Sequence, residues 1–373
     1  MSTDSKPSAP PAAPTGPVDP GGRPVASYRT SLVTALLGVW FTVGLFLDAW
    51  AHNNKADLET FFTPWHGVFY TGFTATAGWI AWTIWRNVLA GRRGLAAVPI
   101  GYGPTLIGLV GFAVAGVGDM LWHIVYGVEQ DIDILFSPTH LMLITAMFVI
   151  VTTPVRAAWA DRSLPAAPGL RRLLPAVLST ALATTLVLLA LQYSNVLLYG
   201  NGGVLVALAE VEEDMTASFV AKMAMTNLLL LLPLLTLARR WELPAGTATV
   251  LYLAVGALAG AVTDFGNTEM ILGFVASGVL VDVLARWLRP TPSRLARFRA
   301  FATLAPLVTW TVFVVTAYAT NDATVVRAPE AGGGTVDAVV ELYTGVPVVQ
   351  ALLGLLVAAL LVPGRVSESD RAG

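Results

Sequence analysis

The chain has no cysteine and few charged residues, and these two features restrict the kinds of metal site and the class of protein to which it can belong. Without cysteine there are no disulfides, iron–sulfur clusters or thiolate metal sites, so any bound metal must sit on nitrogen and oxygen ligands. Charged residues make up 12% of the 373 residues, whereas soluble domains carry about 25%. Together with a hydrophobic share of 55%, this composition predicts an integral membrane protein.

Several function classes find no support in the sequence. No glycine-rich stretch has the spacing of a nucleotide-binding loop, and no Gly-x-Ser-x-Gly nucleophile motif is present. The basic residues lie in short connectors rather than along one face, so we expect no nucleic-acid partner. The partner that the composition does predict is the lipid bilayer.

The apolar segments predict an all-α, polytopic bundle. A helix needs about 20 mostly apolar residues to cross the hydrocarbon core of a bilayer. About ten segments meet this length, so we expect about ten transmembrane spans. They lie near residues 30–52, 62–85, 103–126, 137–158, 173–198, 217–238, 246–264, 268–288, 300–319 and 344–362.

The domain organisation follows from these segments. Residues 1–28 are rich in proline, serine and glycine and predict a disordered cytoplasmic tail. Residues 29–158 form a duplicated four-helix unit that we expect to bind metal. Residues 159–365 hold six further transmembrane helices without histidine, and residues 366–373 form a second cytoplasmic tail.

Charge in the connectors predicts the orientation. Arginine gathers in every second connector, most densely between Arg286 and Arg299, and the intervening connectors are acidic. Cytoplasmic loops carry the excess of arginine and lysine. We therefore expect both termini in the cytoplasm of a multi-pass plasma-membrane protein, with the acidic connectors on the extracytoplasmic face.

All four histidines of the chain fall in two copies of one motif near that outer face. In each copy an aspartate precedes a histidine by four residues at the end of a span, and a second histidine follows Thr-Pro or Ser-Pro at the start of the next span. The six residues are Asp48, His52 and His66 in the first copy, and Asp119, His123 and His140 in the second.

The spacing predicts that each copy brings one carboxylate and two imidazoles together. Residues four apart share a helix face, and Thr or Ser followed by Pro favours a helix start. Two histidines and one carboxylate form a recognised ligand set for non-haem iron, and imidazole sites also suit copper and zinc. The spacing leaves open one dinuclear or two mononuclear sites, and equally ordinary interfacial residues in which aspartate only accepts a bond from histidine.

Other polar residues at the same depth are weaker candidates. Asp264, Asn267 and Glu269 lie at a predicted outer hairpin, where they either orient the metal ligands or simply cap a turn. Gln192, Tyr193 and Asn195 end the fifth span and are candidates for lining the same vestibule.

The doubled motif resembles the C subunit of the copper membrane monooxygenases, the particulate methane and ammonia oxidisers, over residues 40–145. That resemblance implies copper as the metal, with Asp48, His52 and His66 as one ligand set and Asp119, His123 and His140 as the other. Asp119 stands where the family has Asn. The chain also has more spans than that subunit and no exported copper-binding β-domain.

Three functional hypotheses follow from the motif and the resemblance. The first is an oxidoreductase, a monooxygenase or a subunit of one, that acts on a small apolar substrate with copper, or else iron or zinc. Its partners would be other monooxygenase-type subunits or further copies of the chain. The second hypothesis is a metal transport or storage protein, and the third is a structural membrane subunit with a stabilising metal.

Overall fold

The computed structural model describes residues 22–55, 63–127, 134–209, 213–321, 326–327, 335–336 and 339–363. Most of the predicted tail over residues 1–28, and all of the one over residues 366–373, lies outside these residues. The described chain is a helical bundle, with one short antiparallel pair of strands, β1 (Val326–Arg327) and β2 (Thr335–Val336). Within the described residues, eight helical segments are long and apolar enough to cross a membrane, so the protein is a multi-pass membrane protein.

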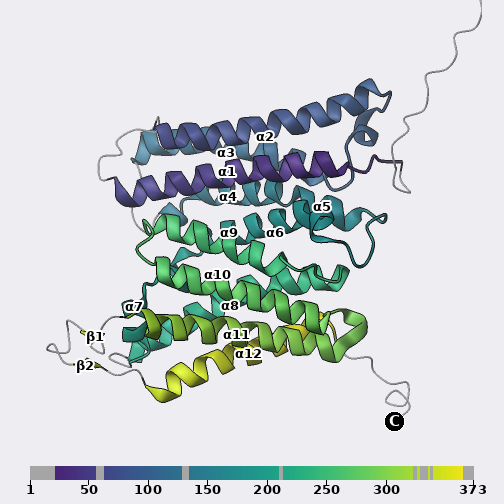
Figure 1. The fold of residues 1–373 in the computed structure, drawn as a ribbon. Coiled ribbons are helices and arrows are strands. Elements are labelled where there is room, and N and C mark those ends of the chain that lie inside the picture. Colours follow the sequence, from purple (N-terminus) through teal and green to yellow (C-terminus); the bar gives the residue numbers. More distant parts are fainter. Residues whose placement is uncertain are drawn as a thin grey trace, which may run out of the picture.

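The described chain is almost entirely helical (Figure 1). In order they are α1 (Tyr28–Asn54), α2 (Pro64–Leu89), η1 (Gly94–Ala97), α3 (Gly103–Tyr126), α4 (Pro138–Val151), α5 (Thr153–Ala160), α6 (Leu170–Ala190), η3 (Gln192–Ser194), η4 (Val196–Leu198), α7 (Asn201–Ala207), α8 (Glu213–Arg240), α9 (Thr247–Val262), α10 (Thr268–Leu288), η5 (Pro292–Arg294), α11 (Leu295–Thr320) and α12 (Val340–Leu361).

Each of the ten predicted segments contains a helix, but α2 and α9 are not among the eight candidate spans. Helix α9 has only 16 residues. Helix α2 has 26 residues, yet it is rich in tryptophan and threonine, which lower its hydropathy. Helix α1 begins and α12 ends on the same side of the bundle (Figure 1).

Two predicted segments differ from the observed helices. The segment 137–158 is broken at Thr152 into α4 and α5, because Pro154 has no N–H for the preceding turn. The guanidinium of Arg156 donates to the carbonyl oxygen of Val149 (2.8 Å) and so satisfies one group near the break. The segment predicted over 173–198 ends as α6 at Ala190 and continues in the short turns η3 and η4.

The bundle has two main packing regions joined by α6. Helices α1 to α5 lie together at one end of the arrangement, and α8 and α10 to α12 lie at the other (Figure 1). Helix α6 contributes Leu182 and Leu186 to the buried core of the first region, and Leu173 and Val177 to that of the second. Within the first region, α1 packs against α2 and α3 against α4, which brings the ends of consecutive helices together.

Candidate metal centre

The first cluster lies where α1 ends and α2 begins. Asp48 and His52 are one turn apart on α1, and His66 stands in the first turn of α2, where the Thr63 hydroxyl accepts from the His66 backbone N–H. Asp48 Oδ1 lies 3.4 Å from His66 Nδ1, and Asp48 Oδ2 lies 3.9 Å from His52 Nε2. Asp48 and His66 are both buried, as the predicted inward orientation requires.

The second cluster repeats this arrangement between α3 and α4. Asp119 Oδ2 lies 3.5 Å from His123 Nε2, and Asp119 Oδ1 lies 3.2 Å from His140 Nε2. Asp119 is only 1% exposed. Ser137 precedes α4 as predicted, but its hydroxyl bonds the hydroxyl of Thr139 (2.8 Å) rather than capping the helix.

The spacing of the donor atoms fits a metal ion. In each cluster the three ligand atoms lie within 4.8 Å of one another. Separations of 3.4 to 3.9 Å are longer than a normal N–H···O hydrogen bond, which measures about 2.7–3.2 Å. Two ligands each about 2.1 Å from one tetrahedral ion are roughly 3.4 Å apart. The clusters are therefore spaced as ligands of a common ion, and the 3.2 Å between His140 Nε2 and Asp119 Oδ1 is close to the same separation.

Surrounding groups hold the second cluster in a ligating geometry. The backbone carbonyl oxygen of Ile134 lies 2.9 Å from Nδ1 of His140. The backbone carbonyl oxygen of Gly127 lies 3.3 Å from Nδ1 of His123. A carbonyl oxygen can only accept, so these contacts favour the tautomer in which Nδ1 carries the proton and Nε2 presents its lone pair toward Asp119. Asp119 Oδ1 also accepts from the Thr139 hydroxyl (2.8 Å). Such outer contacts orient ligands and raise metal affinity.

The first cluster has fewer such supports. The Thr63 hydroxyl lies 3.0 Å from His66 Nδ1, the same nitrogen that faces Asp48. That hydroxyl therefore competes with a metal for the ring nitrogen, whereas the carbonyls in the second cluster bond the opposite nitrogen. We expect the Asp119 cluster to bind a given metal more tightly than the Asp48 cluster.

Replacing Thr139 with valine tests the support of Asp119. Valine keeps the shape of the side chain and removes the hydroxyl that donates to Oδ1, so metal affinity of the second cluster should fall about tenfold. Competition with a chelator of known affinity measures the change. Thr145→Val, at an exposed position of the same helix, is the control and should leave the affinity unchanged.

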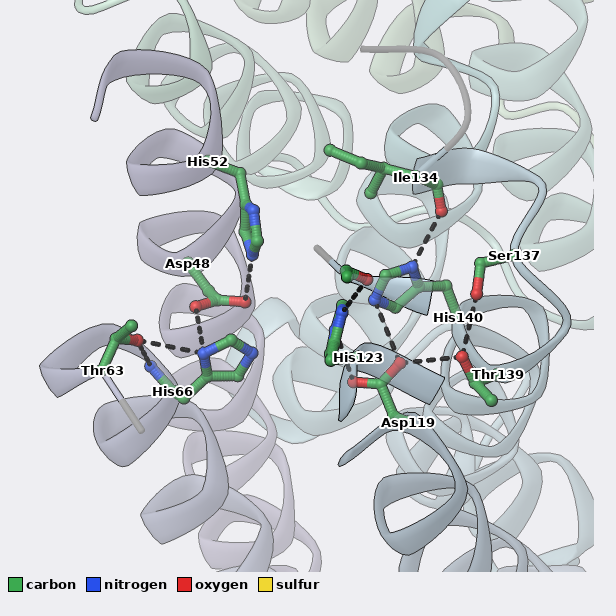
Figure 2. Close-up of polar contacts among 11 residues, drawn as sticks. Asp48, His52, Thr63, His66, Asp119, His123, Ile134, Ser137, Thr139 and His140 are labelled. Atoms are coloured by element: carbon green, nitrogen blue, oxygen red, sulfur yellow. Dashed lines mark hydrogen bonds and ion pairs between the residues drawn. The ribbon is translucent and has the colours of Figure 1, made fainter. Parts of the chain in front are cut away.

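The two clusters face each other across one cavity of about 80 Å³. Figure 2 shows the Asp48 cluster on one side and the Asp119 cluster on the other, with their polar groups directed toward the space between them. A water molecule needs about 10–15 Å³ on this measure, so the cavity holds several waters or one small ligand. The residues from the clusters that line it are Asp48, His52, His66, Asp119 and His140.

The rest of the cavity wall is mostly apolar. It is formed by side chains such as Phe69, Leu143, Ile144 and Met147, and by Leu189 from α6. This apolar wall lowers the effective dielectric constant around the ligand atoms and so strengthens electrostatic interactions inside the cavity.

An aromatic cluster closes the bundle beneath the two sites. Phe41 lies seven residues, about 10 Å, before Asp48 on α1, and its ring is 5.3 Å from Phe69 and 4.9 Å from Phe112 between centroids. Phe73 contacts Phe112 at 4.4 Å. Phe41 and Phe112 are fully buried. We call Phe41, Phe69, Phe73 and Phe112 the aromatic plug.

All six predicted ligands are brought together, as two groups of three. Of the weaker candidates, Gln192 lines the shared cavity. Asn267 instead ties the α9–α10 turn to η4, because its amide donates to the carbonyl of Leu197 (2.5 Å) and accepts from Thr263 (2.8 Å). Asn195 caps η4 through the N–H of Leu197 (3.0 Å).

Sequence reasoning missed one polar residue of the cavity, Tyr70. The sequence does contain a pattern that could have identified it, because Tyr70 follows His66 by four residues and therefore lies on the same helix face. The second copy has Ile144 at the matching position after His140, so the duplication itself did not point to tyrosine.

No protein-family model, curated protein or solved structure matches this chain. The fold and the clusters define it as a multi-pass helical membrane protein with two His/His/Asp groups that are candidate metal sites.

Proposed function

We propose that the protein binds two copper ions near the outer face of the membrane and acts as an oxidoreductase of the copper membrane monooxygenase type, as a relative of the C subunit. Its substrate would be a small apolar molecule that enters from the bilayer. The observation that carries the proposal is the doubled cluster, in which two Asp/His/His groups of matching geometry face one small cavity.

The donor chemistry supports copper without requiring it. Both clusters offer imidazole nitrogen and carboxylate oxygen, which also suit iron and zinc. The resemblance to the copper-binding C subunit favours copper among the three. When bound, a copper ion supplies one-electron redox chemistry at the cavity. The residues of the chain hold the ion, orient the imidazoles and keep bulk water away.

The clusters favour two mononuclear sites over one dinuclear site. Each group of three donors is compact, and no donor set within the described residues combines both clusters. Each cluster offers three protein ligands, so a four-coordinate ion held there would have room for one further ligand.

We propose a plasma-membrane protein of ten spans, in which α2 and α9 cross the membrane in addition to the eight candidate spans. Both termini lie in the cytoplasm. Arginine-rich connectors on the side where α1 begins support this orientation. The metal sites then lie near the extracytoplasmic face. Other monooxygenase-type subunits or further copies of the chain are the proposed partners. A partner of the first kind would supply the electrons that an oxidoreductase of this type needs.

Transport of the metal is less well supported by the interior of the bundle. A translocation path needs polar or ionisable groups through the membrane. The aromatic plug lies directly beneath both sites. In the described parts of α1, α2 and α3 beyond the plug, the buried polar residues are threonines, namely Thr30, Thr34, Thr76, Thr83 and Thr105. Copper uptake into proteoliposomes would favour transport instead.

Metal content and spectroscopy test the proposal. The wild-type protein and the variant with His52→Ala and His123→Ala are purified in parallel after growth with copper, and bound metals are measured by mass spectrometry. We expect copper in the wild type, with a Cu(II) electron paramagnetic resonance spectrum typical of nitrogen ligands, and little in the variant. Gln192→Ala, which changes a polar cavity residue outside both clusters, should keep its copper. Equal, negligible copper in all three proteins would remove the basis for a redox role.

A further inference from the structure

An apolar groove lies between the two packing regions of the bundle. Its walls are α4 and α5 from the first region and α8 from the second, and the buried residues Ala183 and Thr184 of α6 lie between them. The groove has a volume of about 280 Å³. Phe148 and Leu232 on its two walls are 39% and 38% exposed, although both stand within membrane-spanning helices. The groove therefore opens toward the hydrocarbon of the bilayer.

The groove has the length of one leaflet. Along α8 it extends from Leu229 to Leu237, which is about 12 Å at 1.5 Å per residue. Half of the hydrocarbon core of a bilayer is about 15 Å thick. Helix α8 ends at Arg240 beside the end of α5, on the side of the bundle where α1 begins (Figure 1). The groove thus matches an acyl chain in the leaflet on that side, away from the metal clusters.

A guanidinium group lies at that end of the groove. Arg240 follows Thr236, a groove residue, by four positions and so shares its helix face. The side chain reaches from α8 to the carbonyl oxygen of Asp161, the residue that follows α5 (3.4 Å). It also lies over the ring of Trp241, at 5.3 Å from the centroid. These contacts place a positive charge between the two walls.

The neighbouring carboxylates are engaged elsewhere. The Asp161 carboxylate accepts from the backbone N–H of Ser163 (2.8 Å), and Glu242 forms an ion pair with Arg294 (3.3 Å). Within the described residues, the contacts of the Arg240 guanidinium are a carbonyl oxygen and an aromatic ring. Guanidinium groups bind phosphate oxygens through charge-assisted hydrogen bonds. An anionic group at the end of the groove would therefore complement Arg240.

Trp159 marks the same depth on the opposite wall. It follows Val155, a groove residue, by four positions and is 42% exposed. Its ring packs edge-on against Trp241, with 5.5 Å between centroids. Tryptophan is enriched where hydrocarbon meets the headgroups. The apolar groove therefore ends at the depth at which lipid headgroups lie.

We propose that the groove binds one anionic phospholipid, with an acyl chain between the two packing regions and the headgroup phosphate at Arg240. The apolar walls fit the chain, and the positive charge at the groove end complements the headgroup. The lipid contacts α4 and α5 on one side and α8 on the other, so it links the two packing regions. The site is separate from the metal clusters and does not depend on copper.

Lipid titration followed by native mass spectrometry tests the site on the full-length protein in detergent. The probes are phosphatidylglycerol and phosphatidylcholine with the same acyl chains, and inorganic phosphate is the competitor. Arg240→Gln removes the charge at the groove end. Arg239→Gln is the matched control, because Arg239 is the exposed neighbour of Arg240 on α8. Thr236→Trp fills the groove and leaves Arg240 in place.

We expect the wild type to bind phosphatidylglycerol about tenfold more tightly than phosphatidylcholine, without competition from inorganic phosphate. Arg240→Gln should lose this preference, Arg239→Gln should keep it, and Thr236→Trp should weaken both lipids about tenfold. Melting curves without added lipid check that each variant is folded. The wild type and Thr236→Trp decide the question even if Arg240→Gln does not fold.

Four outcomes would overturn the proposal. Equal affinity of the wild type for the two lipids would remove the role of the headgroup charge. Equal losses in both arginine variants would show a general effect of surface charge. Unchanged binding in Thr236→Trp would place the lipid outside the groove. Displacement of phosphatidylglycerol by inorganic phosphate would show a site for a free anion.

Discussion

Replacing Asp119 with alanine should leave the protein with one copper ion in place of two. Asp119 is the shared neighbour of His123 and His140, at 3.5 Å and 3.2 Å, and the single carboxylate of its cluster. Alanine removes the anionic ligand and leaves two imidazoles without the group that fixes their spacing. The first cluster shares no ligand with the second, so its ion should remain.

Asp48→Ala is the reciprocal substitution. This variant should also retain one copper ion, which is bound by the second cluster. The variant with both substitutions should retain none. Metal content per chain, measured on matched amounts of folded protein, gives these numbers directly. The electron paramagnetic resonance spectra of the two single variants should differ, because the second cluster has the backbone carbonyls of Ile134 and Gly127 behind its imidazoles and the first has Thr63.

A dinuclear site predicts another pattern. If one pair of ions were bound jointly by all six residues, either single substitution would weaken both ions, and each variant would lose nearly all its copper. That result would contradict two independent sites and would require the two hairpins to approach one another when metal binds. Copper content unchanged in both single variants would contradict the ligand assignment altogether.

The composition of each cluster could be predicted from the sequence because it depends on local geometry. An aspartate and a histidine four apart share a helix face in any helix, and Thr63-Pro64 or Ser137-Pro138 fixes where the next helix begins. A short connection then makes consecutive helices antiparallel neighbours. These three local facts are sufficient to bring Asp48, His52 and His66 together.

The relation between the two clusters depends on packing that no local pattern encodes. Which faces of the two hairpins meet is decided by side chains of the aromatic plug and by Leu182 and Leu186 of α6. The position of the Tyr70 ring likewise depends on the space above Gly116, which belongs to another helix. The break between α4 and α5 was not predicted, although the sequence shows Pro154, because the stretch is mostly apolar and has the length of one span.

Replacing Gly44 with alanine should disable the first cluster and spare the second. Gly44 lies one turn before Asp48, where α1 crosses α2 closely. A Cβ atom there would be 2.7 Å from Phe69 Cα and 3.0 Å from its backbone nitrogen. Gly72 makes the reciprocal contact, with 2.7 Å to Phe41 Cα. Small residues at such crossings allow helix backbones to approach in membranes.

Backbone atoms cannot rotate away, so the alanine must push α1 and α2 apart. Ordinary van der Waals contact begins near 3.4 Å, and the shift is therefore at least about 0.7 Å. Metal–ligand distances tolerate only about 0.2 Å, and Asp48 and His66 stand on the two helices that separate. We expect the metal affinity of the first cluster to fall about 100-fold, with little change in the second.

Gly67→Ala and Gly78→Ala are matched controls on α2, because an added Cβ meets nothing within 4 Å at either position. Gly67 is the neighbour of His66, so its variant also tests whether any substitution next to the ligand disturbs it. Both controls should keep two copper ions and unfold at an equal or higher temperature, since alanine favours a helix over glycine by roughly 0.5–1 kcal/mol. Full copper in Gly44→Ala, or an equal loss from both clusters, would show that the close crossing of α1 and α2 does not set the geometry of the Asp48 site.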